Sequence, residues 1–144
     1  MSIQKATQEL KDHVGQMARL MNERDVMAVA DRMADDIVIV RPTGNPLSKD
    51  HWVKMLLSED VEMKGTALVD INSINVNDSC DMGYVCYTTH SAFSYKGVEN
   101  NDVAVFVAIF KLFGTDWKIV YMQRSTGRLP TDPRPNFDKT YFKN

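Results

Sequence analysis

The chain has 144 residues and a formal net charge of −2, and it is 44% hydrophobic and 25% charged. These values suit one soluble globular domain with a core of its own. The near-neutral charge and the absence of a Lys/Arg stripe argue against a nucleic-acid-binding surface. No apolar run approaches the roughly 18 residues that cross a membrane, and the start MSIQKATQEL does not resemble a signal peptide, so we expect a cytoplasmic protein.

The first half of the sequence predicts three helices and one strand. Residues 3–22 form an amphipathic pattern with Leu10, Val14 and Met17 on one stripe. Asp25 is a candidate N-cap for a second helix, which we expect to run through Met33. A short apolar strand at 37–40 and a Pro/Gly-rich turn at 41–46 follow, and Ser48 caps a third helix at 49–57.

The second half changes to the two-residue period of strands. We predict strands at 66–77, 80–95, 101–113 and 117–126, joined by connections of hairpin length. The fold class is therefore α+β, with N-terminal helices packed on a largely antiparallel, strongly curved sheet. We expect one domain over residues 1–126 and a Pro-rich tail over 127–144. The tail either docks through Phe137, Tyr141 and Phe142 or is a flexible extension.

Both faces of the strand at 101–113 are apolar, so both faces should be covered. We assign Ala104, Phe106, Ala108, Phe110 and Leu112 to the helix side, and Val103, Val105, Val107 and Ile109 to the opposite side. A second copy of the chain would cover that opposite face in a homodimer, and the alternative cover is the C-terminal tail. On the last strand, the same reasoning turns Val120, Met122 and Arg124 inward, and Trp117, Ile119 and Tyr121 outward.

Cys80 and Cys86 are expected on one strand, where about 3.3 Å per residue separates their Cα atoms by about 20 Å. A disulfide requires less than about 7 Å, so both should be free thiols. The sequence has no second Cys/His pair at zinc-ligand spacing and no glycine-rich phosphate loop. We therefore expect neither a metal nor a cofactor.

The order of these segments, with MADDIVIVRP, the turn GNPLS, the helix HWVKML and the final DWKIVYMQRS, resembles the nuclear transport factor 2-like superfamily. That superfamily includes SnoaL-like polyketide cyclases, ketosteroid isomerases and scytalone dehydratase. The resemblance covers roughly residues 5–126 and implies a cone with an interior pocket and dimers formed through the sheet. The segment WKIVYMQRS looks most like the last strand of the calcium/calmodulin-dependent kinase II association domain.

The resemblance implies that Arg124 points into the pocket and helps to hold an anion. A guanidinium at the end of an apolar cone would pair bidentately with a carboxylate. The alternative is an arginine that reaches solvent or bonds an acidic neighbour. The other pocket arginines of the association domains would align near Cys86 and Ala108, so the resemblance supports one anion contact at most.

The remaining candidates are His90, Tyr84 and Asp70, with Trp52 and Phe106 as apolar wall. The resemblance places Tyr84 and His90 inside the pocket, where His90 could exchange a hydrogen bond or a proton. Asp70 is the strand carboxylate best placed to act as a base, although its run more often turns polar residues outward.

Three hypotheses follow from these residues. The first is a protein that binds a small, partly apolar and anionic molecule at Arg124, His90, Tyr84, Trp52 and Phe106. The second is a proton-transfer enzyme, an isomerase, dehydratase or cyclase, with His90 or Asp70 as base. The third is a homo-oligomeric assembly module whose pocket is vestigial.

Overall fold

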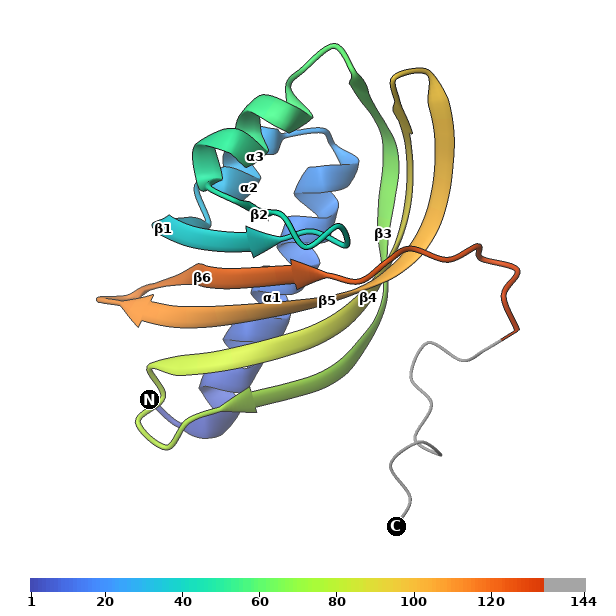
Figure 1. The fold of residues 1–144 in the computed structure, drawn as a ribbon. Coiled ribbons are helices and arrows are strands. Elements are labelled where there is room, and N and C mark those ends of the chain that lie inside the picture. The colour runs from blue at the N-terminus through green and yellow to red at the C-terminus, as the bar shows by residue number, and fades with distance from the viewer. Residues whose placement is uncertain (134–144) are drawn as a thin grey trace.

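The fold combines three helices with a single curled sheet, and the computed structural model describes residues 1–133 of the chain. The helices are α1 (Ile3–Asn22), α2 (Val26–Ala30) and α3 (Lys49–Leu56). The strands are β1 (Met33–Val40), β2 (Pro46–Leu47), β3 (Val61–Val76), β4 (Met82–Tyr95), β5 (Val98–Phe113) and β6 (Asp116–Arg124). Figure 1 shows the long strands β3, β4 and β5 bending around the helices, which lie on one side of the sheet.

Each helix begins at a side chain that caps it. Ser2, Asp25 and Ser48 each accept a hydrogen bond from the backbone N–H three residues later, which satisfies one of the free donors of the first turn. The caps at Asp25 and Ser48 were predicted. On α1 the predicted apolar stripe is buried, with Leu10 and Val14 fully inaccessible to solvent.

The strands form one six-stranded sheet in the order β2-β1-β6-β5-β4-β3. The predicted meander is confirmed, because β3, β4, β5 and β6 pair antiparallel in chain order. β1 extends the sheet by pairing in parallel with β6, with Val40 beside Gln123. The first strand of the chain thus lies against the last one, and the short β2 pairs with β1 at the edge.

Several element boundaries differ from the prediction. The second helix ends at Ala30 and β1 already begins at Met33, because Met33 and Ala34 are buried as parts of a strand paired with β6. β3 begins at Val61 and continues through Gly65, where the register with β4 shifts instead of the strand ending. Cys80 lies in the turn before β4 and not in the strand.

The two faces of β5 divide as predicted. Ala104, Ala108 and Phe110 are buried on the helix side, and Val103, Val105, Val107 and Ile109 alternate with them as partly exposed residues. For this face we use the name outer patch, defined as Tyr84, Val103, Val105, Val107, Ile109 and Tyr121.

The predicted faces of the first half of β6 are wrong. A register shift lies between the pairs Ile109–Tyr121 and Phe110–Ile119, so β6 carries one extra residue there. Such a bulge exchanges the two faces of a strand. Trp117 and Ile119 are consequently buried on the helix side, while Met122 and Arg124, beyond the bulge, keep their predicted inward direction.

The segment after β6 remains attached to β5. The Ser125 N–H donates to the Val105 carbonyl, and Arg128 and Val103 exchange both backbone hydrogen bonds. The close passage requires glycine at 127, since a Cβ there would lie 2.6 Å from the Asp102 Cγ. The predicted docking aromatics Phe137, Tyr141 and Phe142 lie outside the described residues.

Candidate functional site

A cavity of about 320 Å³ lies between the helices and the inner face of the sheet. Its walls are mostly apolar and come from all three helices and from every strand except β2. Met17 and Met21 of α1, Trp52 of α3, Phe93 of β4, and Phe106 and Met122 of the two central strands are among the lining residues. This size and composition are typical of small-molecule sites.

Tyr87 and Phe106 form an aromatic wall of the cavity. Their rings stack with centroids 5.3 Å apart and an interplanar angle of 6°. Burial raises the pKa of the Tyr87 phenol well above its ordinary value, so this hydroxyl stays neutral. The hydroxyl forms no hydrogen bond with any residue in the described range, which leaves a neutral donor available at the wall.

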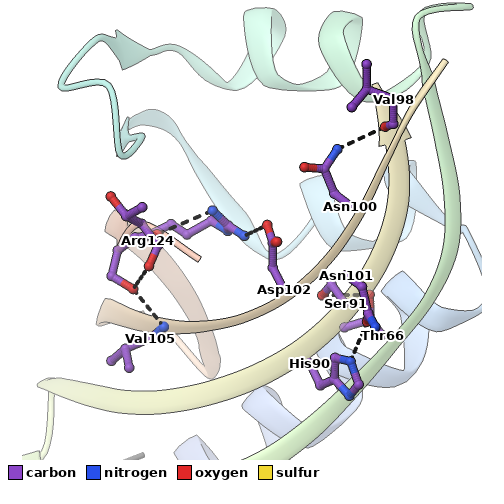
Figure 2. Close-up of polar contacts among 11 residues, drawn as sticks. Thr66, His90, Ser91, Val98, Asn100, Asn101, Asp102, Val105 and Arg124 are labelled. Atoms are coloured by element: carbon purple, nitrogen blue, oxygen red, sulfur yellow. Dashed lines mark hydrogen bonds and ion pairs between the residues drawn. The ribbon is translucent and has the colours of Figure 1, made fainter. Parts of the chain in front are cut away.

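Arg124, the last residue of β6, lines the cavity from beside Phe106. Its Nη2 atom lies 3.1 Å from the Asp102 Oδ2 atom, its Nη1 atom donates to the Ser125 carbonyl at 3.3 Å, and its guanidinium lies 6.0 Å from the Phe106 ring centroid. Figure 2 shows this guanidinium pointing toward Asp102. Arg124 therefore combines the two predicted environments, because it borders the cavity and also bonds an acidic neighbour.

Arg41 is a second cation in the cavity lining. It follows β1 directly and precedes Pro42, which keeps its backbone extended, so its side chain continues the inward alternation of Ile37 and Ile39. The sequence predicts Arg41 only as part of the turn at 41–46. The sequence pattern that indicates its inward direction is its place two residues after Ile39 and four after Ile37, because alternate residues of a strand share a face.

The lining contains no aspartate, glutamate or histidine, so within residues 1–133 the two arginines are its only groups that are charged near neutral pH. Over the same range no three His, Cys, Asp or Glu residues are close enough to hold a metal ion. None of the described helices is long and apolar enough to cross a membrane. The arrangement suits an apolar molecule that carries negative charge.

A family model described as "Protein of unknown function (DUF3804)" matches residues 6–132. The chain belongs to this family. No curated protein matches it. The description of the family states no activity. Several solved structures are similar to the DUF3804 chain and indicate its fold.

The DUF3804 chain is similar to an NTF2-like (nuclear transport factor 2-like) protein of unknown function from Prochlorococcus marinus. The TM-score is 0.77 at 27% identity, over 98% of this chain and 99% of that one. A ketosteroid isomerase-like protein from Erwinia carotovora has a TM-score of 0.64 at 21% identity, over 83% of this chain and 94% of that one. The fold is therefore NTF2-like, as predicted.

The association domain of Caenorhabditis elegans CaMKII is also similar in structure to the DUF3804 chain. Its TM-score is 0.64 at 14% identity, over 83% of this chain and 94% of that one. At this identity, and at that of the isomerase-like protein, the likeness concerns the fold alone.

Of the predicted site residues, Trp52, Phe106 and Arg124 line the cavity of the DUF3804 chain, and Tyr84, His90 and Asp70 do not. The predicted inward direction of Tyr84 and His90 is wrong. In the β4–β5 register, His90 lies opposite Val103 and Tyr84 opposite Ile109, which places both on the outer face. The lining residues of β4 are mainly the odd-numbered ones, which alternate with Tyr84 and His90 along the strand. They are Tyr87, Thr89, Ser91, Phe93 and Tyr95, together with Ala92.

His90 and Asp70 have surroundings that do not suit proton transfer to a ligand in the cavity. The His90 Nε2 atom lies 2.6 Å from the Asn101 Oδ1 atom, a contact drawn in Figure 2. Asp70 is exposed, lies opposite Thr88 and borders a shallow surface hollow with Lys11. The two candidate bases of the enzyme hypothesis are therefore separated from the cavity.

Proposed function

We propose that this protein binds a small, partly apolar anion in the cavity between its helices and its sheet. The observation that carries the proposal is an apolar cavity whose lining includes two arginines and no acidic residue within the described range. A charged group placed in such surroundings attracts an opposite charge more strongly than it would in water. In this proposal Trp52 and Phe106 contact the apolar part of the ligand, and Arg124 is an anion contact.

The proton-transfer enzyme is not the function that we propose. One similar structure is named ketosteroid isomerase-like, but the cavity lining within residues 1–133 has no carboxylate or imidazole to accept a proton. General acid–base catalysis needs such a group within hydrogen-bond reach of the substrate. His90 and Asp70 do not meet this geometric requirement.

We also propose that two copies of the chain pair through the outer patch and that the protein resides in the cytoplasm. The partly exposed valines of β5 and the exposed Tyr84 support pairing, because soluble monomers rarely leave such faces open. The thiols of Cys80 and Cys86 are free, which suits a reducing compartment. The assembly-module hypothesis shares this dimer but assigns no role to the cavity.

The proposal is tested by thermal unfolding with a panel of small carboxylates of differing apolar size. A ligand that binds only the folded state at 100 times its Kd stabilises it by about 2.7 kcal/mol, on the order of 10 °C for a domain of this length. The variant Ala18→Phe places a ring in the cavity lining and should abolish the shift. Arg19→Phe adds the same ring to the exposed side of α1 and should retain the shift.

If no compound raises the melting temperature of the wild-type chain, or if Ala18→Phe responds as the wild type does, binding in this cavity is contradicted. The assembly-module hypothesis would then become the better account of the protein.

A further inference from the structure

Arg41 has few partners for a partly buried guanidinium. Its Nη1 atom lies 3.9 Å from the Met55 Sδ atom, and a thioether is a weak acceptor. Its Nε atom is buried and has no hydrogen-bond partner, and no carboxylate of the described residues lies within ion-pair distance of Arg41. A buried charged donor without an acceptor is costly, which indicates that an acceptor from outside the described residues completes this site.

Arg124 differs from Arg41 because the protein already supplies its counter-ion. Asp102 on β5 bonds its guanidinium at 3.1 Å, and the two side chains are about equally buried, with 22% and 25% of their surfaces exposed. The Ser125 carbonyl and the Phe106 ring occupy further parts of the guanidinium. An incoming anion would have to share Arg124 with Asp102, whereas no carboxylate of residues 1–133 would compete for Arg41.

The two arginines project from neighbouring strands at the same edge of the cavity. β1 and β6 run parallel with Val40 beside Gln123, so Arg41 and Arg124 follow at adjacent positions, and both line the cavity. Among the described residues, Arg41 and Arg124 carry two positive charges at this edge and Asp102 carries one negative charge, which leaves one positive charge uncompensated. A ligand with one negative charge would neutralise it, whereas a second negative charge would be left unpaired in apolar surroundings.

From these contacts we infer that Arg41 is the main anion contact and that the ligand is a monoanionic carboxylate with an apolar body. The inference rests on the proposed function, and it adds the residue that recognises the charge and the class of ligand. The planar carboxylate can accept the Nε–H and an Nη–H of Arg41 together, which is the bidentate geometry that guanidinium favours. Arg124 then acts beside it as a secondary contact.

The size of the cavity limits the apolar body. At about 30 Å³ per water molecule, its 320 Å³ corresponds to on the order of ten small atoms or groups. Trp52, Phe93 and the stacked pair of Tyr87 and Phe106 provide flat walls for it. Octanoate and 4-phenylbutanoate match this size with one charge each, and octan-1-ol and 4-phenylbutan-1-ol are neutral counterparts.

The test measures the Kd of these four compounds by isothermal titration calorimetry. The wild-type chain should bind each carboxylate at least ten-fold more tightly than its alcohol, since a charge-assisted hydrogen bond contributes that much. Arg41→Gln should remove this preference and leave alcohol binding unchanged within about three-fold. Octyl phosphate, which carries more than one negative charge near neutral pH, should bind the wild-type chain more weakly than octanoate.

The double variant Arg124→Gln/Asp102→Asn is the matched control. It removes one positive and one negative charge together, so the cavity edge keeps its net charge and Arg41 is untouched. Carboxylate affinity should fall, but by less than it falls in Arg41→Gln, because Arg124 is only the secondary contact. If this double variant loses carboxylate binding while Arg41→Gln keeps it, Arg124 is the main contact and the inference is wrong.

Failure of the inference is distinguishable from failure of the proposed function. Equal affinity of the wild-type chain for carboxylate and alcohol would overturn the inference while leaving a cavity that binds apolar molecules. Binding of none of the compounds would contradict the proposed function itself. If Arg41→Gln does not fold, the carboxylate–alcohol comparison in the wild type, together with Arg41→Lys, still decides the matter. Arg41→Lys should retain part of the preference for carboxylates, because it keeps the positive charge but loses the paired N–H donors of the guanidinium.

Discussion

His13 on α1 is held in one protonation state by its neighbours. The Arg32 Nη1 atom lies 2.7 Å from the His13 Nδ1 atom, and because arginine only donates, this nitrogen accepts and carries no proton. Arg32 also donates to the Gln16 side chain at 2.7 Å. Burial first and the Arg32 charge second lower the pKa of His13 in the folded protein, and Glu9, Asp12 and Asp116 oppose this only in part.

The lowered pKa predicts a pH-dependent stability. As the pH falls through about 6.5, His13 of the unfolded chain takes up a proton, whereas His13 of the folded protein takes one up only at a lower pH because its pKa is lowered. The free energy of unfolding should therefore fall with pH below about 6.5 and be independent of this group above about 7.5. His13→Asn keeps an acceptor for Arg32 and should flatten this dependence, as measured by urea unfolding between pH 5 and 8. The control His51→Asn alters an exposed histidine and should keep the wild-type dependence.

A wild-type stability that rises as the pH falls from 7 to 5.5, or an unchanged dependence in His13→Asn, would contradict this account of the contact between His13 and Arg32.

At the scale of elements, the sequence predicted the type and order of most helices and strands, and errors in face came from register. The two-residue connection Lys96–Gly97 sets Tyr95 opposite Val98 and therefore His90 opposite Val103. Pairing along this hairpin places His90 on the outer face, whereas the resemblance to the family implied an inward direction. The bulge in β6 is different in kind, because nothing in WKIVYMQRS marks the extra residue that turns Trp117 and Ile119 inward. The indole N–H of Trp117 donates to Glu9 at 2.8 Å, a contact 108 residues apart that no local pattern predicts.

Two glycines predict opposite effects of the same substitution. Gly83 of β4 lies under α1, where a Cβ would approach both the Asn75 carbonyl oxygen and the Leu10 Cδ1 atom to 2.7 Å. Gly83→Ala should therefore lower the free energy of unfolding by about 1–3 kcal/mol through overpacking. Gly15 within α1 has no atom within 4 Å of its Cβ position, so Gly15→Ala should raise it by about 0.5–1 kcal/mol. Urea unfolding measures both variants; a Gly83→Ala variant at least as stable as the wild type would contradict overpacking at Gly83, and a destabilised Gly15→Ala would contradict the open space at Gly15.

At the scale of the whole molecule, the two faces of the sheet correspond to the two proposed roles, ligand binding and pairing of two copies. The inner face and the helices enclose the cavity, and the outer patch is available to a second copy of the chain. The sequence predicted this division from β5 alone, because both of its faces are apolar. The inward direction of Arg124 was predicted, but its position beside Arg41 was not, since that depends on the parallel pairing of β1 with β6, which are far apart along the chain.

The dimer proposal predicts a monomeric variant with an intact fold. Val107→Glu places a charge in the outer patch without entering the core, so the particle mass should fall from twice the 16.4 kDa of the chain to that of one chain. Val98→Glu changes the same residue type on the same strand, at the exposed hairpin end, and should stay dimeric. Size-exclusion chromatography with light scattering measures both. A monomeric wild type at every concentration, or a dimeric Val107→Glu, would refute pairing through this patch.

The parallel pairing of β1 with β6 also has a consequence during synthesis on the ribosome. Residues 33–40 are synthesised early, but β6, the strand that pairs with them, ends only at Arg124. β1 can therefore join the sheet only after β6 has been synthesised. Arg41, which directly follows β1, comes to lie beside Arg124 in the same step. A nascent chain halted before β6 therefore contains the three described helices and Arg41 but lacks the strand that pairs with β1, so the proposed anion site is completed only after Arg124 has been synthesised.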